Sequence, residues 1–112
     1  MSGIQVASSH VVGQIIQAVY PLPGGFDGAP LAVSAVSAQT VAKATNEAFY
    51  IYSNTPIHIN IGNNPTATLN DPPIPSNTPM VFAISQGMKI AVVKMAGFAD
   101  GSCWIHNLKV RP

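Results

Sequence analysis

The sequence predicts an all-β fold, an antiparallel β-sandwich or jelly roll of seven to eight short strands. Apolar and polar residues alternate over several short segments, and clusters of Gly, Pro, Asn and Asp interrupt them at regular intervals. No segment has a convincing amphipathic helical period. Short alternating segments separated by turns are typical of two-sheet β-domains.

The first third of the chain is the least regular. We expect residues 1–10, which are short and polar, to form an N-terminal arm before a single domain of residues 11–112. Residues 11–20 resemble a strand interrupted by Gly13, and the Pro- and Gly-rich residues 21–30 predict an extended loop. For residues 31–41 we favour strand over helix, because β-branched residues recur there.

The period of two is clearest from residue 47 onward. In residues 48–52, Phe and Ile face one side while Tyr50 and Tyr52 face the other, and three Ile residues share a face in residues 57–61. Further strands are expected at residues 80–85, 88–95 and 103–110. The side chains expected to form most of the core are Phe49, Ile51, Ile57, Ile59, Ile61, Phe82, Ile84, Ile90 and Val92.

Turn-forming residues separate these strands. The tetrapeptide Ser-Asn-Thr-Pro occurs at residues 53–56 and again at 76–79, and each copy runs into an apolar strand. We expect its Asn and Thr side chains to hold a turn and its Pro to preset φ where the next strand begins. The Pro-rich connection at residues 62–75 is expected to contain one short edge strand, and Gly87 and residues 100–101 are expected to form hairpin turns.

The chain of 112 residues has only five basic and four acidic residues, with no run of like charges. Binding a nucleic-acid backbone needs several cations to neutralise phosphates, so we expect no nucleic-acid partner. No apolar run approaches the roughly 20 residues that span a bilayer, so we expect no membrane partner either. Charged residues are depleted at interface cores, and this composition therefore favours a protein that assembles with others.

The residues that could support catalysis or bind a metal are scattered. Cys103 and His106 have a C-x-x-H spacing, but an odd offset sends them to opposite faces of a strand, and a tetrahedral site needs further ligands. We interpret Cys103 as a small buried side chain. No nucleophile motif is present, and Asp27, Asp71 and Asp100 lie in turn contexts that already explain them. We therefore expect a protein that is not an enzyme and has no cofactor and no metal.

Three aromatic side chains in the strands are the best anchors for a partner. Tyr50, Tyr52 and Trp104 are amphipathic side chains of the kind enriched in interfaces and in sugar-binding faces. The alternative for each of them is a sheet face that the other sheet covers. For Trp104 we favour core packing, because it alternates with His106, Leu108 and Val110.

The second half of the chain resembles small virion proteins of tailed bacteriophages. The resemblance covers about residues 47–110 and depends on residues 57–67 (IHINIGNNPTA), 71–75 (DPPIP) and 87–92 (GMKIAV). It implies a β-sandwich that decorates or cements the capsid, as a dimer or trimer bound where major capsid subunits meet. It supplies no catalytic residues.

We therefore expect a phage structural protein on the capsid surface of the virion, made in the host cytoplasm, whose partners are the major capsid protein and further copies of itself. The alternatives are a tail, fibre or baseplate component and a carbohydrate- or receptor-binding sandwich. The candidate interface residues are Tyr50, Tyr52, Asn63, Asn64, Pro72, Pro73 and Ile74.

Overall fold

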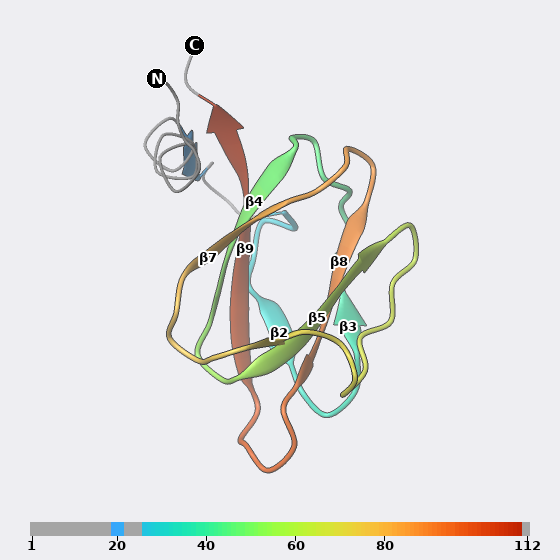
Figure 1. Ribbon diagram of the computed structural model, residues 1–112, viewed down its shortest axis with the longest axis vertical. Coiled ribbons are helices and arrows are strands. Elements are labelled where there is room, and N and C mark those ends of the chain that lie inside the picture. Colours follow the sequence, from blue (N-terminus) through green and yellow to red (C-terminus); the bar gives the residue numbers. More distant parts are fainter. Residues whose placement is uncertain (1–18, 22–25, 111–112) are drawn as a thin grey trace, which may run out of the picture.

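The computed structural model describes residues 19–21 and 26–110. Within these residues the chain forms nine strands and no helix, and the strands make two antiparallel sheets that face each other (Figure 1). The predicted antiparallel β-sandwich is therefore confirmed.

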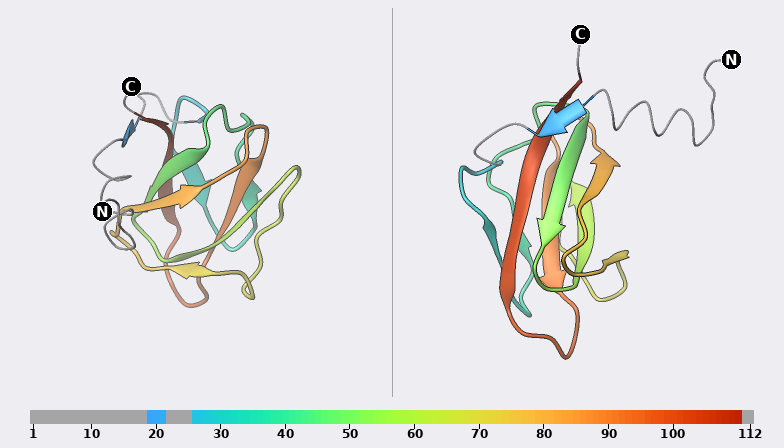
Figure 2. Two further views of the ribbon diagram at one scale, coloured as in Figure 1. Left: turned by 45° about the horizontal axis from the view of Figure 1, so that its top comes forward. Right: turned by 90° about the vertical axis from the view of Figure 1, so that its left-hand side faces the viewer.

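The larger sheet is built around the longest strand. Its strand order is β1-β9-β4-β7, and β2 pairs with another part of β9. In Figure 2, β9 runs beside β4, while β1 pairs with residues 108–110 of β9 and β2 with residues 101–103. The strands of this sheet are β1 (Val19–Pro21), β2 (Leu31–Val33), β4 (Ala48–Ser53), β7 (Met80–Ala83) and β9 (Gly101–Val110).

The smaller sheet has the strand order β3-β8-β5-β6. Its central pair, β5 and β8, is in register over six residues, from Ile57 opposite Lys94 to Gly62 opposite Lys89. The two-residue strand β6 is the short edge strand expected in the Pro-rich connection. The strands of this sheet are β3 (Ala38–Gln39), β5 (Ile57–Gly62), β6 (Pro73–Ile74) and β8 (Lys89–Lys94).

The strand order defines a jelly roll. Strands β2-β9-β4-β7 form one four-stranded layer and β3-β8-β5-β6 the other, while β1 extends the edge of the first layer. Among β2 to β9, only β5 and β6 are successive strands that lie in the same sheet. The prediction of hairpins at Gly87 and at residues 100–101 is therefore wrong. Gly87 is in a turn, with φ of 90°, but the β7–β8 and β8–β9 connections each cross from one sheet to the other.

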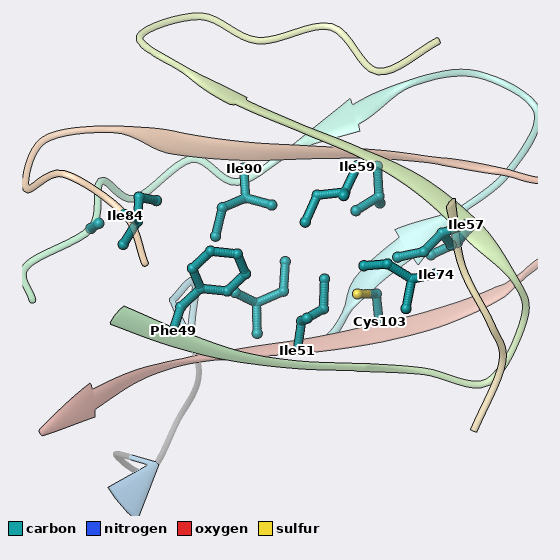
Figure 3. Close-up of a cluster of buried hydrophobic side chains, with 12 residues drawn as sticks. Phe49, Ile51, Ile57, Ile59, Ile74, Ile84, Ile90 and Cys103 are labelled. Atoms are coloured by element: carbon teal, nitrogen blue, oxygen red, sulfur yellow. The ribbon is translucent and has the colours of Figure 1, made fainter. Parts of the chain in front are cut away.

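The core lies between the two layers. Phe49, Ile51 and Cys103 of the larger sheet point toward Ile59 and Ile90 of the smaller sheet (Figure 3). Of the nine predicted core residues, the seven that are buried are Phe49, Ile51, Ile57, Ile59, Ile84, Ile90 and Val92. Fully burying one such side chain contributes roughly 1.5–3 kcal/mol, so this cluster is the main source of stability.

Two predicted core residues are less buried, and one prediction is wrong. Phe82 is half-buried against the core, and Ile61, near the end of β5, is 37% exposed. Trp104 does not pack in the core: it lies opposite Tyr52 in the β4–β9 pairing, half-buried on the outer face. The reason is the period of two, because the adjacent Cys103 and Ile105 are both buried.

The two Ser-Asn-Thr-Pro segments form neighbouring turns. The Asn77 N–H of the second copy donates a hydrogen bond to the Ser53 carbonyl of the first, at 2.7 Å. In the first copy, the Asn54 side chain accepts a hydrogen bond from the Ser102 N–H at 2.8 Å, and the Thr55 hydroxyl donates one to the Ala99 carbonyl at 2.8 Å. The first copy thus joins the start of β9 to the end of β4.

The remaining expectations concern the N-terminal part of the chain. Residues 31–41 contain β2 and β3 and no helix, as predicted. The expected arm, residues 1–10, and all but the last two residues of the strand expected at 11–20 lie outside the described residues.

Candidate functional site

The seven predicted interface residues do not form one surface. Tyr50 and Tyr52 lie on β4 of the larger sheet, whereas the other five lie in or beside the Pro-rich connection that joins β5 to β6 of the smaller sheet. The structure therefore presents two candidate surfaces on opposite layers of the sandwich. A single flat partner cannot cover both.

The first surface is a group of four rings on the outer face of the larger sheet, which we call the aromatic hollow. Tyr50 pairs with His106 across the β4–β9 ladder, and Tyr52 pairs with Trp104. The ring centroids are 6.1 Å apart in the first pair and 5.9 Å apart in the second, with interplanar angles of 65° and 59°. The alternation of β4 and β9 sends these rings outward while their neighbours Phe49, Ile51, Cys103 and Ile105 fill the core.

These four side chains enclose a shallow hollow of about 360 Å³. None of them is a Lys, Arg, Asp or Glu side chain, and each ring carries a nitrogen or oxygen atom. Three of the four Phe residues of the chain pack in or against the core instead. The hollow is thus amphipathic: its ring faces are apolar and its ring edges can form hydrogen bonds.

The Tyr52 ring is held in place by a hydrogen bond. Its hydroxyl donates to Oδ1 of Asn77 at 3.0 Å. Asn77 has a φ of 56°, in the left-handed region that Asn tolerates better than most residues. This contact orders one side of the aromatic hollow before any partner binds.

The second surface is the connection of residues 63–73, which we call the loop surface. It lies over the outer face of the smaller sheet, where Ala67 packs against Ala91 and Val93 of β8. The Ala67 N–H donates a hydrogen bond to the Ser37 hydroxyl at 2.8 Å. Buried Pro65 adds to this packing, so the connection is attached to its own sheet along much of its length.

Side-chain hydrogen bonds hold the loop surface in one conformation. The Asp71 carboxylate accepts hydrogen bonds from the Thr68 N–H at 2.7 Å and from the Thr68 hydroxyl at 3.2 Å. The Asp71 carbonyl lies 2.8 Å from Nδ1 of His58, whose side chain is 9% exposed. Because a carbonyl can only accept, His58 must carry its proton on Nδ1.

The predicted residues of the loop surface differ in exposure. Asn63, Asn64, Pro72 and Pro73 are exposed, as a contact surface requires. Ile74 is only 2% exposed and belongs to the core, so its side chain offers no surface and we remove it from the candidate contacts.

The candidate contacts predicted from the sequence omit three residues of these two surfaces. Leu69, in the Pro-rich connection, is 57% exposed on the loop surface. Trp104 and His106 complete the aromatic hollow. Their position could have been deduced, because a buried Cys103 requires both residues to face outward.

Cys103 and His106, the C-x-x-H pair of the sequence, do not come together in the structure. Burial raises the pKa of the Cys103 thiol to about 12, so the reactive thiolate is not formed at neutral pH. His106 lies on the opposite face of β9 from Cys103, and the described residues contain no group of three or more His, Cys, Asp or Glu side chains placed to hold a metal ion.

Comparisons of the chain with protein-family models, with curated proteins and with solved structures find no match. In the part of the chain that the structure describes, no helix is long and apolar enough to cross a membrane.

Proposed function

We propose that this protein is a structural component of a tailed-phage particle that decorates or cements the capsid by bridging major capsid subunits. The observation that carries the proposal is the loop surface, an internally ordered surface on a small jelly roll with exposed polar side chains and a single charged residue. The resemblance of residues 47–110 to small phage virion proteins supports the same assignment.

The loop surface has the properties of a protein-binding surface. Asp71 is the only charged residue between positions 62 and 75, and its carboxylate already accepts hydrogen bonds from Thr68. A partner that covers the loop therefore meets a single carboxylate, which is already hydrogen-bonded, and no Lys or Arg side chain of the loop. The exposed Leu69 supplies an apolar anchor beside the exposed Asn and Pro side chains.

The order of the loop reduces the entropic cost of binding. Gln39 donates a hydrogen bond to the Asn64 side chain at 2.9 Å, and the Asn60 side chain donates one to the Thr66 carbonyl at 3.0 Å. Binding by a segment that is already ordered loses little conformational freedom. On a capsid, repeated contacts of this kind add through effective concentration, so each can be weak.

The same properties suit a tail, fibre or baseplate component, which also assembles through uncharged surfaces. Jelly rolls occur in viral capsid proteins and in lectins, and a fold does not by itself assign a function. The location within the particle is therefore the first thing to measure. Electron microscopy of the parent phage should reveal many copies across the head shell, and a few copies confined to the tail would contradict the proposal.

A particle-binding assay tests the surface directly. Particles that lack the protein are incubated with purified protein and washed, and occupancy is measured at increasing concentration. Leu69→Ala should weaken binding at least about fivefold, which corresponds to about 1 kcal/mol. Val36→Ala is the matched control, because Val36 is an exposed apolar residue (74%) outside the loop, and it should bind normally.

The heat stability of the particles distinguishes a cement protein from one that binds the shell without stabilising it. Particles that carry the protein should release their DNA at a higher temperature than particles without it, because binding only to the assembled shell stabilises that state. Equal heat stability of the two preparations would reject the cement role. Unchanged occupancy by Leu69→Ala would remove the loop from the interface.

A further inference from the structure

The aromatic hollow lies on the opposite layer from the loop surface, so a partner bound to the loop leaves it open. We propose that the aromatic hollow, lined by Tyr50, Tyr52, Trp104 and His106, binds neutral carbohydrate. This inference does not depend on the proposed role in a phage particle.

The chemistry of the four rings selects the class of ligand. The face of an aromatic ring carries partial negative charge, and the C–H groups on one face of a sugar ring carry partial positive charge. In neither ring pair do the rings stack face to face. The edges of these rings bear hydroxyl, indole and imidazole groups, which are hydrogen-bonding partners for sugar hydroxyls.

The absence of charge selects a neutral ligand. None of the described residues that line the hollow is a Lys or Arg, so they supply no permanent positive charge to pair with a carboxylate, phosphate or sulfate group. Lys94, on the other sheet, forms an ion pair with Asp100 at 2.8 Å. An acidic ligand would lose hydration at the hollow without gaining an opposite charge.

The shape of the hollow also fits a sugar better than a protein segment. Its volume of about 360 Å³ lies at the low end of the ~300–1,000 Å³ of small-molecule sites, and it is shallow. A wholly apolar protein segment would cover the ring edges of Tyr50 and Trp104 without offering a hydrogen-bond partner to the hydroxyl or the indole N–H, which is costly. A short oligosaccharide satisfies those edges and covers the ring faces at the same time.

The site is already formed in the unbound protein. The rings project from β4 and β9, which pair along five residues at the centre of the larger sheet. The hydrogen bond from Tyr52 to Asn77 fixes one wall. Aromatic side chains have few rotatable bonds, so binding orders little that was free before.

The chain offers a direct spectroscopic test, because Trp104 is its single tryptophan. The full-length protein is titrated with maltotriose, cellotriose and triacetylchitotriose while the indole fluorescence is followed, and a neutral-glycan array extends the range of sugars. We expect at least one neutral glycan to give a saturable change. Because no net charge is involved, its affinity should be nearly the same at 50 mM and 500 mM NaCl.

Variants assign the binding to the hollow. Trp104→Ala and Tyr50→Ala should each weaken the affinity for the identified glycan at least tenfold, measured by calorimetry because the first variant lacks the fluorophore. Phe98→Ala is the matched control: Phe98 is an exposed aromatic residue (50%) outside the hollow, and its removal should leave affinity unchanged. Circular dichroism verifies the fold, and the conservative Trp104→Tyr, which keeps an aromatic face, should retain measurable binding.

Several results would overturn the inference. They are the absence of binding by any neutral glycan at about 10 mM, salt-sensitive binding of acidic glycans alone, and full affinity in Trp104→Ala. If Trp104→Ala instead loses particle occupancy, the hollow is a protein contact and the carbohydrate assignment is wrong. Leu69→Ala reports on the loop surface separately, so the two proposals can fail independently.

Discussion

Tyr52 and Asn77 link the aromatic hollow to the two repeated turns of the chain. The Tyr52 hydroxyl donates a hydrogen bond to Oδ1 of Asn77 at 3.0 Å, and the Asn77 N–H donates one to the Ser53 carbonyl at 2.7 Å. The turn before β7 is therefore attached to the end of β4 through both its backbone and its side chain. Asn77 does this from a left-handed conformation, with a φ of 56°.

Asn77→Ala should lower the free energy of unfolding by about 1–2 kcal/mol, because alanine is strained at positive φ and the bond to Tyr52 is lost. Asn77→Gly loses the same bond without the strain and should cost less. Urea denaturation of both variants measures the difference. If Ala and Gly destabilise equally, backbone strain contributes nothing at this position.

The stability of the protein should fall as pH rises from about 9 to about 12. The pKa of Cys103 is raised by burial from 9.0 to about 12, so in this range the unfolded chain loses a proton that the folded chain keeps. The contribution is fully present below pH 9 and is lost at about 1.4 kcal/mol per pH unit above it.

To isolate the contribution of Cys103, the measurement is the difference between the wild-type protein and Cys103→Ala. The free energy of unfolding of the wild-type protein should fall more steeply with pH. Parallel curves would contradict the assignment. A thiol reagent at neutral pH should modify Cys103 only on unfolding, because the side chain is buried.

Gly101→Ala should be destabilising by about 1–3 kcal/mol, because a methyl group there would collide with the Asn54 and Thr55 side chains. Asn54 would have to move, and its hydrogen bond to the Ser102 N–H would break. Gly62→Ala is the matched control, since the nearest atom to its added Cβ is Pro65 Cβ at 3.9 Å, an ordinary contact. Equal denaturation midpoints for the two variants would show that the start of β9 can adjust freely.

His58→Ala should loosen the loop surface without unfolding the sandwich. It removes the hydrogen bond to the Asp71 carbonyl and leaves a space beneath the loop. Amide hydrogen exchange at Thr68 and Ala67 should accelerate, while exchange in β4 and β9 should not. Leu69→Ala truncates an exposed side chain on the same loop and should leave the exchange rates at Thr68 and Ala67 as in the wild-type protein.

The isolated protein should be a dimer or trimer at micromolar concentration. Only nine of its residues are charged, its net charge is +1, and the described surface exposes Val36, Val41, Leu69 and Phe98. Little electrostatic repulsion therefore opposes association. Sedimentation equilibrium measures the mass directly, and a folded monomer of 11.7 kDa at these concentrations would contradict this prediction.

The fold class and most of the core follow from local alternation along the chain. In strands, the side-chain period is two. The alternation in residues 48–52 therefore predicts that Phe49 and Ile51 are buried and that Tyr50 and Tyr52 face outward. The same rule, applied to Cys103, would have placed Trp104 correctly. These features are local, and they follow from residues adjacent in the chain.

The surfaces that the protein presents depend on long-range strand pairing. The prediction of a turn at Gly87 is confirmed. A turn residue does not determine whether the next strand joins the same sheet or crosses to the other one, because that depends on long-range pairing. The crossings bring β4 beside β9, and so join residues 50 and 52 to residues 104 and 106, while they place residues 63–73 on the other layer. Two surfaces on opposite layers therefore replace the single interface that the sequence suggested, since strand pairing between distant segments, and not local pattern, determines which side chains meet.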